Sequence, residues 1–184
     1  MGLRRISDDF RQSARTLKRI RPLVMTAMLL ALQIILGTLT IPVGQSIQIT
    51  FDYLPACLTA MLFGPVPAFL TGALADLISF VLRPTGAFHP GFMLSPALAG
   101  VIYGLFFYRR EPVRLWQFIV ARLLAAALCN VCLNSLWLLQ LYGQTAWAWI
   151  PGRVLKNAVE LPVSVVLLLA IQRIIVPLRK NILS

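Results

Sequence analysis

Long apolar stretches, separated by short polar or Pro- and Gly-rich connections, make up the chain after residue 22. Six such segments can be delimited: about Leu23–Leu39, Phe51–Phe63, Pro65–Leu82, Phe92–Tyr108, Leu115–Leu141 and Ile150–Val176. A helix that crosses a bilayer needs roughly 17–25 residues, so the pattern predicts a bundle of six transmembrane helices over residues 23–176. The second segment is short for a crossing, and we expect it to be broken, tilted or sheltered. Gly64-Pro65 should end it, because this pair favours a turn over a continuous helix.

Composition supports a membrane protein. Hydrophobic residues make up 59% of the 184 residues and charged residues only 12%, with a mean hydropathy of +0.81. A soluble domain carries roughly 25% charged residues, about twice as many. The chain has no long Gly/Ser linker and no internal repeat. We therefore expect one all-α integral domain over residues 1–184, multi-pass in the cell membrane.

The first 22 residues are strongly basic, with seven Lys or Arg. A secretory signal would have a shorter basic region and a cleavage site of small residues, and neither fits. Ile6, Phe10, Ala14 and Leu17 recur at helical spacing, which predicts an amphipathic helix along the cytoplasmic membrane surface. Nucleic-acid binding is the alternative. Because a hydrophobic segment follows directly, we favour a topology signal and expect no nucleic-acid partner.

The distribution of cations predicts that both termini face the cytoplasm. With six crossings, all but three of the 17 Lys and Arg then fall on the inner side. The inner set includes four residues around the fourth connection: Arg109, Arg110, Arg114 and Arg122. The three cations left near the outer face are Arg83, Arg153 and Lys156.

These three outer cations need partners, because a cation buried at the end of a span is costly. The acids in the same predicted outer half are Asp52, Asp76 and Glu160. One interpretation is that the six residues form structural ion pairs. The other is a pocket in which Arg and Lys receive an anion while an acid reads hydrogen-bond donors of the ligand. We favour the pocket, because both cation-bearing connections are rich in aromatic residues.

The connection Arg83–Phe92 holds the only histidine, His89, together with Phe88, two Pro and two Gly. Pro removes a backbone donor and Gly removes the side chain that restrains φ, so we expect a shaped loop. A polar loop within the hydrocarbon must be covered by protein or line a water-filled cavity. We interpret it as the cap of a small-molecule site at one membrane face. An ordinary turn is the alternative.

Residues 40–50 have a sequence pattern that differs from that of the apolar segments. Gln45, Ile47 and Ile49 alternate with polar residues after a Pro and a Gly, which predicts a short hairpin or extended flap. Such a flap could close over a ligand, and a static connector is the alternative.

Catalytic motifs are absent. A single histidine excludes a multi-histidine zinc site, and the chain has no Walker A loop, no Gly-x-Ser-x-Gly elbow and no paired acids with a base. We therefore expect no enzymatic activity, no catalytic residue, no metal and no cofactor. If the protein transports uphill, the energy must come from a partner or an ion gradient.

Small residues four apart mark the first span, at Ala27 and Ala31. Such a strip allows another helix to approach closely. A partner protein or another helix of the same bundle could use it.

Several stretches together resemble the substrate-binding (S) components of energy-coupling factor (ECF) vitamin transporters, most closely the folate-type members. They are Ile41-Pro42-Val43-Gly44, Phe63-Gly64-Pro65, Gly72-Ala73-Leu74-Ala75-Asp76, Arg83-Pro84-Thr85-Gly86, Pro90-Gly91-Phe92, Gly100-Val101-Ile102-Tyr103-Gly104, Asn134-Ser135-Leu136-Trp137 and Arg153-Val154-Leu155-Lys156-Asn157. The resemblance implies a six-helix bundle with a vitamin site at its outer face, closed by the connections between spans one and two, three and four, and five and six. It also implies three partners, a membrane-coupling subunit and two ATPases, with Ala27 and Ala31 as the docking strip. Arg83 departs from the pattern, which usually has Asn or Leu before this Pro.

Folate fits the charge argument. Its glutamyl tail carries two carboxylates, which suit Arg153 and Lys156. Its pterin ring presents an amino-pyrimidine edge for Asp76 and Asn134 and a flat face for Trp137. Other ligands to consider are pantothenate or a pyrimidine, and other classes are a stand-alone carrier or a scaffold. The candidate substrate-binding residues are Gln45, Asp76, Arg83, Phe88, His89, Phe92, Asn134, Trp137, Arg153, Lys156 and Asn157.

Overall fold

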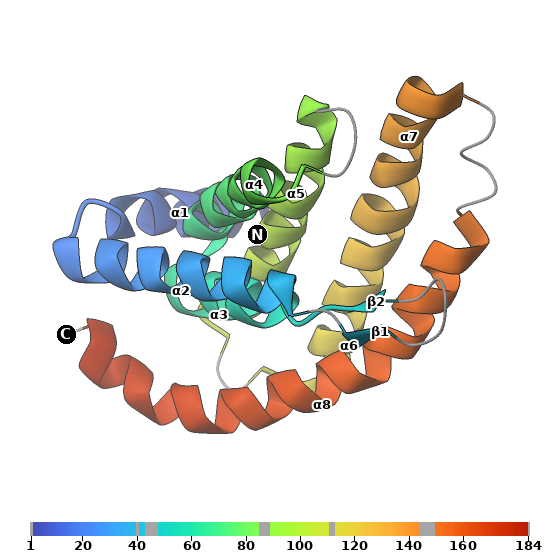
Figure 1. Ribbon diagram of the computed structural model, residues 1–184. Coiled ribbons are helices and arrows are strands. Elements are labelled where there is room, and N and C mark those ends of the chain that lie inside the picture. Colours follow the sequence, from blue (N-terminus) through green and yellow to red (C-terminus); the bar gives the residue numbers. More distant parts are fainter. Residues whose placement is uncertain are drawn as a thin grey trace.

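The computed structural model describes residues 2–39, 41–42, 48–84, 89–110, 113–143 and 150–183. Of residues 2–5, 41–42, 48–49, 142, 150–155 and 173–183 it describes the backbone alone. Over these ranges the chain is helical apart from one short hairpin (Figure 1). Its helices are α1 (Gly2–Thr16), α2 (Ile20–Thr38), α3 (Tyr53–Phe63), α4 (Pro65–Leu82), α5 (Pro90–Phe107), α6 (Leu115–Leu124), the π-helical η1 (Ala125–Leu133), α7 (Asn134–Tyr142) and α8 (Ile150–Leu183).

Each of the six predicted apolar segments is a helix. The fifth is continuous through α6, η1 and α7, and α8 continues past the predicted end at Val176. Among the described residues, four helices are long and apolar enough to cross a membrane: α2, α4, α5 and the helix over residues 115–141. Figure 1 shows α8 curving along one side of the bundle, below α2 and α3.

The short α3 is sheltered, as the sequence predicted. Almost all of its residues are buried among the other helices. It ends at Gly64, whose φ of 92° lies in the region that favours glycine, and Pro65 begins α4. The predicted break between the second and third segments is therefore confirmed.

The helices α4 and α5 pack with their backbones in close contact. A Cβ atom on Gly72 would lie 2.5 Å from the carbonyl oxygen of Pro96, and one on Gly100 would lie 2.4 Å from that of Ala68. Only glycine allows two helices to approach this closely. The main core cluster continues from this pair into α3, α6 and α8, and includes Cys57, Met61, Phe107, Phe118 and Leu168.

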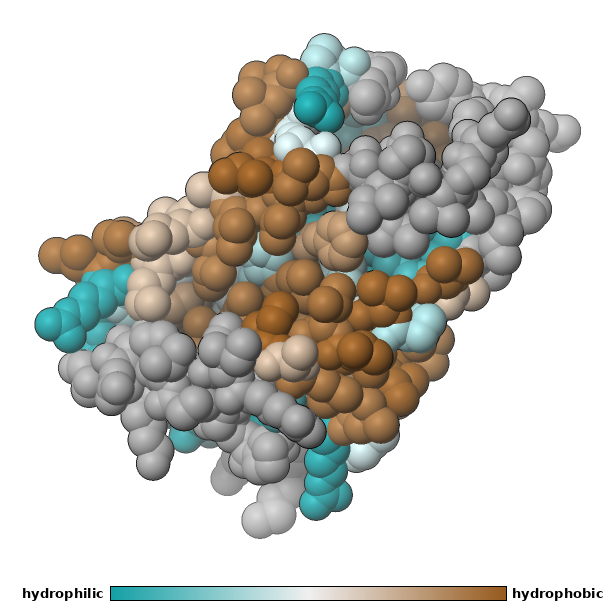
Figure 2. Space-filling view, turned by 60° about the horizontal axis from the view of Figure 1, so that its bottom comes forward, coloured by the Kyte–Doolittle hydropathy of each residue, from teal (hydrophilic) through white to brown (hydrophobic). Residues whose placement is uncertain are grey.

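The outer surface of the bundle is rich in exposed apolar side chains. Val24, Met28, Val81, Leu128 and Val166 are among them. Figure 2 shows hydrophobic atoms across most of the described face in view. Such contiguous apolar surface is expected where lipid replaces water around a protein.

The predicted hairpin in residues 40–50 is confirmed in its described part. Strands β1 (Ile41–Pro42) and β2 (Gln48–Ile49) pair antiparallel, with Ile41 opposite Ile49 and Pro42 opposite Gln48. Residues 43–47, including Gln45, lie outside the described residues.

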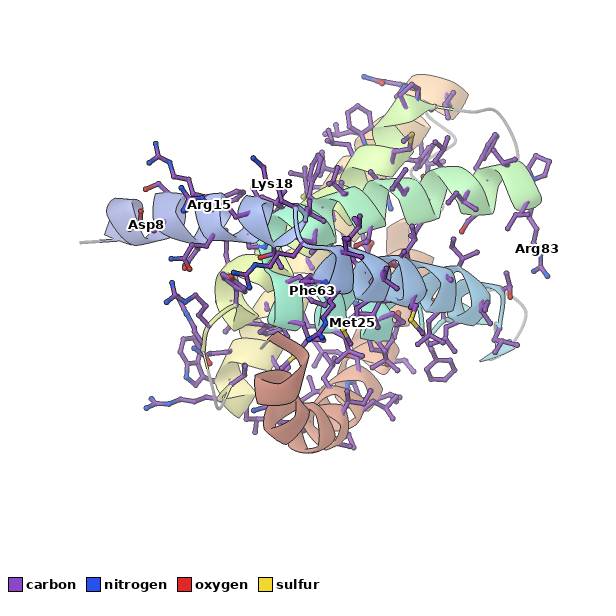
Figure 3. All side chains as sticks on the ribbon, turned by 90° about the vertical axis from the view of Figure 1, so that its left-hand side faces the viewer. Asp8, Arg15, Lys18, Met25, Phe63 and Arg83 are labelled. Carbon is purple, nitrogen blue, oxygen red and sulfur yellow. The ribbon has the colours of Figure 1, made fainter. Side chains whose placement is uncertain are left out.

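The basic N-terminal segment forms α1, so the predicted helix is confirmed. A turn at residues 17–19 separates it from α2. Figure 3 shows Arg15 on the left of the view and Arg83 at the far right, with Lys18 between them. Arg15 and Arg83 therefore lie on opposite sides of the molecule.

Two sequence expectations need correction. Arg122 is not a residue of an inner connection, because it lies in the second half of α6 with its side chain only 8% exposed. Phe92 does not belong to a loop, because α5 already begins at Pro90. Pro is favoured in the first turn of a helix, since no N–H is needed there.

Candidate functional site

A cavity of about 440 Å³ opens between the helices. Its volume is in the range of pockets for small organic ligands, roughly 300–1,000 Å³. Every helix except α1 contributes to its lining, and the polar lining residues are Gln33, Thr50, Asp52, Tyr53, Asp76, Ser95, Tyr103, Arg122, Asn130, Asn134, Lys156, Asn157 and Glu160.

Most of these residues lie at one end of the bundle. They come from the C-terminal halves of α2 and α4 and the N-terminal parts of α3, α5 and α8. Consecutive helices run in opposite directions, so these parts meet at the same end.

A buried ion pair forms the floor of the cavity. Arg122 Nη2 lies 3.1 Å from Glu160 Oε1, and the two side chains are 8% and 5% exposed. Arg122 Nη1 donates a hydrogen bond of 2.9 Å to the hydroxyl of Tyr103. The guanidinium carbon lies 4.3 Å from the centroid of the Tyr53 ring. A buried charge is tolerated only with such partners, so this cluster fixes the position of Arg122 between α3, α5, α6 and α8.

Four buried polar atoms on the lining have no hydrogen-bond partner among the described residues. They are Gln33 Oε1, Tyr53 OH, Ser95 Oγ and Asn134 Oδ1. A buried polar group without a partner costs free energy, about 1–3 kcal/mol each. All four residues line one cavity, so a polar ligand or water there could provide partners for them together.

The η1 segment turns two lining residues toward the cavity. Ala125 and Asn130 are five residues apart and both line it. In a π-helix, backbone hydrogen bonds join residues five positions apart. Residues i and i+5 therefore lie on nearly the same side of a π-helix, whereas an α-helix would place them on different sides. The side-chain amide of Asn130 donates to Asn157 Oδ1 of α8 at 3.0 Å. This contact ties η1 to α8 beside the cavity.

An aromatic cluster adjoins the cavity through Phe92, which is on its lining. The rings of His89 and Trp137 are 5.4 Å apart between centroids, and those of His89 and Phe92 are 6.1 Å apart. His89 also caps α5, since its Nδ1 accepts a hydrogen bond from the N–H of Gly91 at 3.1 Å. A Cβ atom on Gly91 would lie 2.4 Å from the Trp137 ring. The absence of a side chain at Gly91 therefore lets α5 and α7 meet here.

The structure brings five of the predicted site residues to the cavity: Asp76, Phe92, Asn134, Lys156 and Asn157. His89 and Trp137 are not on the lining, but they contact each other and, through His89, reach Phe92. Arg83 is exposed and is not on the lining, and among the described ion pairs it does not pair with Asp76. Phe88 and Gln45 lie outside the described residues, as does the side chain of Arg153.

Several lining residues were not predicted from the sequence, or were predicted to have another role. Gln33, Tyr53, Ser95 and Asn130 were not singled out, and Arg122 was assigned to a connection. A signal was present for Arg122, because an ionisable residue inside a membrane span is a functional candidate by default. Gln33 gives a weaker signal of the same kind in the first span. Nothing in the local sequence distinguishes Ser95 from an ordinary helix-packing serine.

The cavity combines two cations with acids and amides. Lys156 and Arg122 are its cations, and Asp52, Asp76 and Glu160 are its carboxylates. Such a lining can hold a ligand that has an anionic part and a part rich in hydrogen-bond donors. Among the described residues, no group of three or more His, Cys, Asp or Glu is arranged to hold a metal ion.

Comparison with known proteins gives consistent matches over most of the chain. Residues 21–172 match the family model described as ECF transporter, substrate-specific component. A folate transporter FolT from Leuconostoc mesenteroides subsp. mesenteroides is 34% identical over 152 residues, which cover 79% of this chain and 80% of the relative. FolT from Clostridium novyi (strain NT) is 29% identical over 152 residues, covering 83% and 88%. A solved structure, the crystal structure of FolT bound with folic acid, matches with a TM-score of 0.72 and 31% identity over 84% of this chain and 94% of that chain.

Proposed function

The chain belongs to the substrate-specific components of ECF transporters, and from that membership we propose that its cavity binds folate for import. As a member of this family it is a multi-pass membrane subunit of a transporter and not an enzyme. The observation that carries the proposal is the polar cavity, in a fold matching that of FolT bound with folic acid.

We assign the glutamyl carboxylates of folate to Lys156 and to Arg153. Lys156 lines the cavity, and Arg153 lies three residues earlier in α8, about one turn away. Among the described residues of the lining, the other cation, Arg122, is already engaged by Glu160 and Tyr103. Lys156 is therefore the cation best suited to receive an anionic group from a ligand.

We assign the pterin ring to the acid and amide side of the cavity. Asp76 and Asn134 line it from α4 and α7, and the latter has an unpartnered Oδ1. Both can accept hydrogen bonds from an amino-pyrimidine edge. Phe92 supplies an apolar face nearby, and Trp137 is expected to support it through His89.

Calorimetry with two ligands tests this assignment. Lys156→Ala should weaken folate binding by about one to two decades, because a hydrogen bond to a charged group contributes roughly 1.5–3 kcal/mol. Binding of a pterin that lacks the glutamate should change little. Lys18→Ala, which removes an exposed cation that is not on the cavity lining, is the matched control. Equal losses for both ligands would mean that Lys156 holds the fold and not the tail.

We further propose six crossings with both termini in the cytoplasm. Ser13 of the basic α1 bonds to the junction between α3 and α4, and the exposed Arg109 and Arg110 follow the C-terminal end of α5. The cavity is lined mainly by the opposite ends of these helices. Positive residues accumulate on the cytoplasmic side, so the cavity would face outward. Single cysteines at Ala87 and Ser184, in a background without the three native cysteines, should be labelled from opposite sides. Labelling from the same side would refute the six-crossing count.

The family implies an energising partner, and we propose that Ala27 and Ala31 form its docking strip. Both residues are exposed on α2, whereas the buried residues of that helix are Pro22, Thr26 and Gln33. The strip is thus available for another helix to approach. Ala27→Trp should preserve folate binding in detergent and abolish ATP-dependent uptake in vesicles with the coupling subunit and two ATPases. Loss of binding as well would assign the strip to the bundle.

A further inference from the structure

The helix α1 precedes the part of the chain that the family model matches, which begins at residue 21. It is nevertheless built into the fold. Ser13 is 0% exposed, its hydroxyl donates to the carbonyl of Phe63 at 2.8 Å, and it accepts from the N–H of Val66 at 3.0 Å. One side chain of α1 thus serves the last carbonyl of α3 and a free N–H in the first turn of α4.

A second attachment holds α1 beside the first, on the same part of its circumference. Arg109, which follows α5, donates from Nη1 to Gln12 Oε1 at 2.9 Å and lies 3.8 Å from Asp9 Oδ1. Two independent contacts, to the α3–α4 junction and to the end of α5, therefore set the rotation of α1 about its axis. The direction in which its remaining side chains point follows from that rotation.

The exposed side of α1 is cationic. Arg11 and Arg15 are one turn apart, both exposed, and each is two residues from the buried Ser13, so they lie on the opposite side of the helix. Exposed cations continue through the turn into α2, at Lys18, Arg19 and Arg21. These five residues, Arg11, Arg15, Lys18, Arg19 and Arg21, are called the basic stripe below. The only exposed acid among the described side chains of α1 is Asp8, because Asp9 is engaged by Arg109.

We propose that the basic stripe binds the headgroups of anionic phospholipids at the membrane face on which α1 lies. Three residues separate α1 from α2, a helix long and apolar enough to cross the membrane, so the stripe cannot leave the headgroup region. Basic clusters directly beside a transmembrane helix attract anionic lipid, with about a fivefold gain in affinity per cation. The exposed Ile6 lies near the docked side of α1, where it can reach the apolar edge of the interface.

The surface is assigned to lipid and not to a soluble acidic protein for a geometric reason. The basic stripe runs along α1 and through the turn into the start of α2. Because α2 is a candidate membrane span, we expect its first residues, and the stripe with them, at the level of the headgroups. The proposal is independent of the ligand in the cavity, since no residue of the stripe lines it.

Native mass spectrometry of the full chain can test the proposal. The protein is purified with an equimolar mixture of phosphatidylglycerol and phosphatidylcholine of the same chain length, and the ratio of the most tightly held lipids is measured. The wild-type protein should retain phosphatidylglycerol in excess. Arg11→Gln with Arg15→Gln should lower the ratio by about 25-fold, the loss expected for two cations. Arg11→Lys with Arg15→Lys should change it by less than about threefold, because the charge is kept.

Arg83→Gln is the matched control, since it removes an exposed arginine on the opposite side of the molecule and should leave the ratio unchanged. Circular dichroism checks that each variant is folded. The proposal fails if the wild-type protein shows no preference, if the Gln pair keeps the preference, or if the Lys pair loses as much as the Gln pair. It also fails if the Gln pair, in bilayers of phosphatidylcholine alone, no longer associates with the coupling subunit and ATPases where the wild-type protein does. That outcome would make the stripe a protein interface.

Discussion

Glu160→Gln should destabilise the protein strongly while leaving the shape of the cavity almost unchanged. The substitution keeps the volume of the side chain and one acceptor oxygen, but it removes the negative charge beside Arg122. The guanidinium then remains buried with no counter-charge. Breaking a buried ion pair by removing one partner typically costs about 3–5 kcal/mol of unfolding free energy, and we expect a loss in that range.

The geometry supports this magnitude. At the observed 3.1 Å between nitrogen and oxygen, the attraction of two unit charges is about 5 kcal/mol at an effective dielectric constant of 20. Because both side chains are more than 90% buried, the guanidinium has little contact with bulk water that could compensate for the lost partner. The hydrogen bond to Tyr103 and the ring of Tyr53 remain, and a desolvated cation–π contact contributes roughly 2 kcal/mol, so the loss should stop short of the full attraction.

Unfolding in mixed detergent micelles, followed by tryptophan fluorescence, measures the effect in a double-mutant cycle. Arg122→Gln alone should also be strongly destabilising, because it leaves the buried carboxylate of Glu160 without the cation that pairs with it. The double variant should lose less than the sum of the two single variants, by about 2 kcal/mol or more for residues in direct contact. Folate affinity, measured on the folded fraction, should fall less than stability does, since the pair forms the floor and not the assigned ligand contacts.

Additive losses, or a loss below about 1 kcal/mol for Glu160→Gln, would refute the reasoning, because exposed or uncoupled charges behave in that way. A large loss of folate affinity with unchanged stability would assign Glu160 to the ligand instead.

Other substitutions test the helix contacts. Gly100→Ala should destabilise α4–α5 packing by roughly 1–3 kcal/mol, because backbone must move to admit a methyl group, whereas Gly37→Ala, with its nearest atom at 3.5 Å, should be tolerated in the same unfolding assay. If both behave alike, the close approach is not what constrains Gly100. Ser13→Ala should cost roughly 1–3 kcal/mol, because it leaves the buried carbonyl of Phe63 and the partly buried N–H of Val66 without their partner, and it should expose α1 to limited proteolysis. Thr16→Ala, which removes only a bond within α1, is its control, and an equal cost in both variants would contradict the docking of α1.

The sequence predicted the helices well, because hydrophobic length and Gly or Pro breaks are local signals. The break at Gly64-Pro65, the short sheltered α3 and the hairpin after α2 all follow from residues within a few positions. The site was predicted in part for the same reason. Asp76 and Lys156 stand out as charges in apolar segments, and the cavity contains both.

The misassignment of Arg122 has a physical cause. Counting cations by connection assigns each one to the nearer membrane face, and Arg122 lies in the first third of the continuous 27-residue helix Leu115–Leu141. Its true partners, Tyr103 and Glu160, are 19 and 38 residues away in the sequence, and only the packing of α5 and α8 brings them together. The π-helical segment was also not predicted; within it, Asn130 hydrogen-bonds to Asn157 of α8, a residue distant in the sequence.

The glycine contacts between α4 and α5 make this pair of helices the most rigid part of the bundle that we can identify. Where backbone meets backbone, no layer of side chains can change rotamer to let the helices slide. The closely packed α4–α5 pair extends from the cavity, at Asp76 and Phe92, to the start of α4, where Gly104 packs directly on Pro65. Ser13 of α1 hydrogen-bonds to the same region, at Val66. A shift imposed on either end should therefore be carried as a rigid lever to the opposite membrane face. We expect the movement that admits or releases a ligand to occur where the α4–α5 pair contacts α6–α7 and α8, because side chains mediate those contacts.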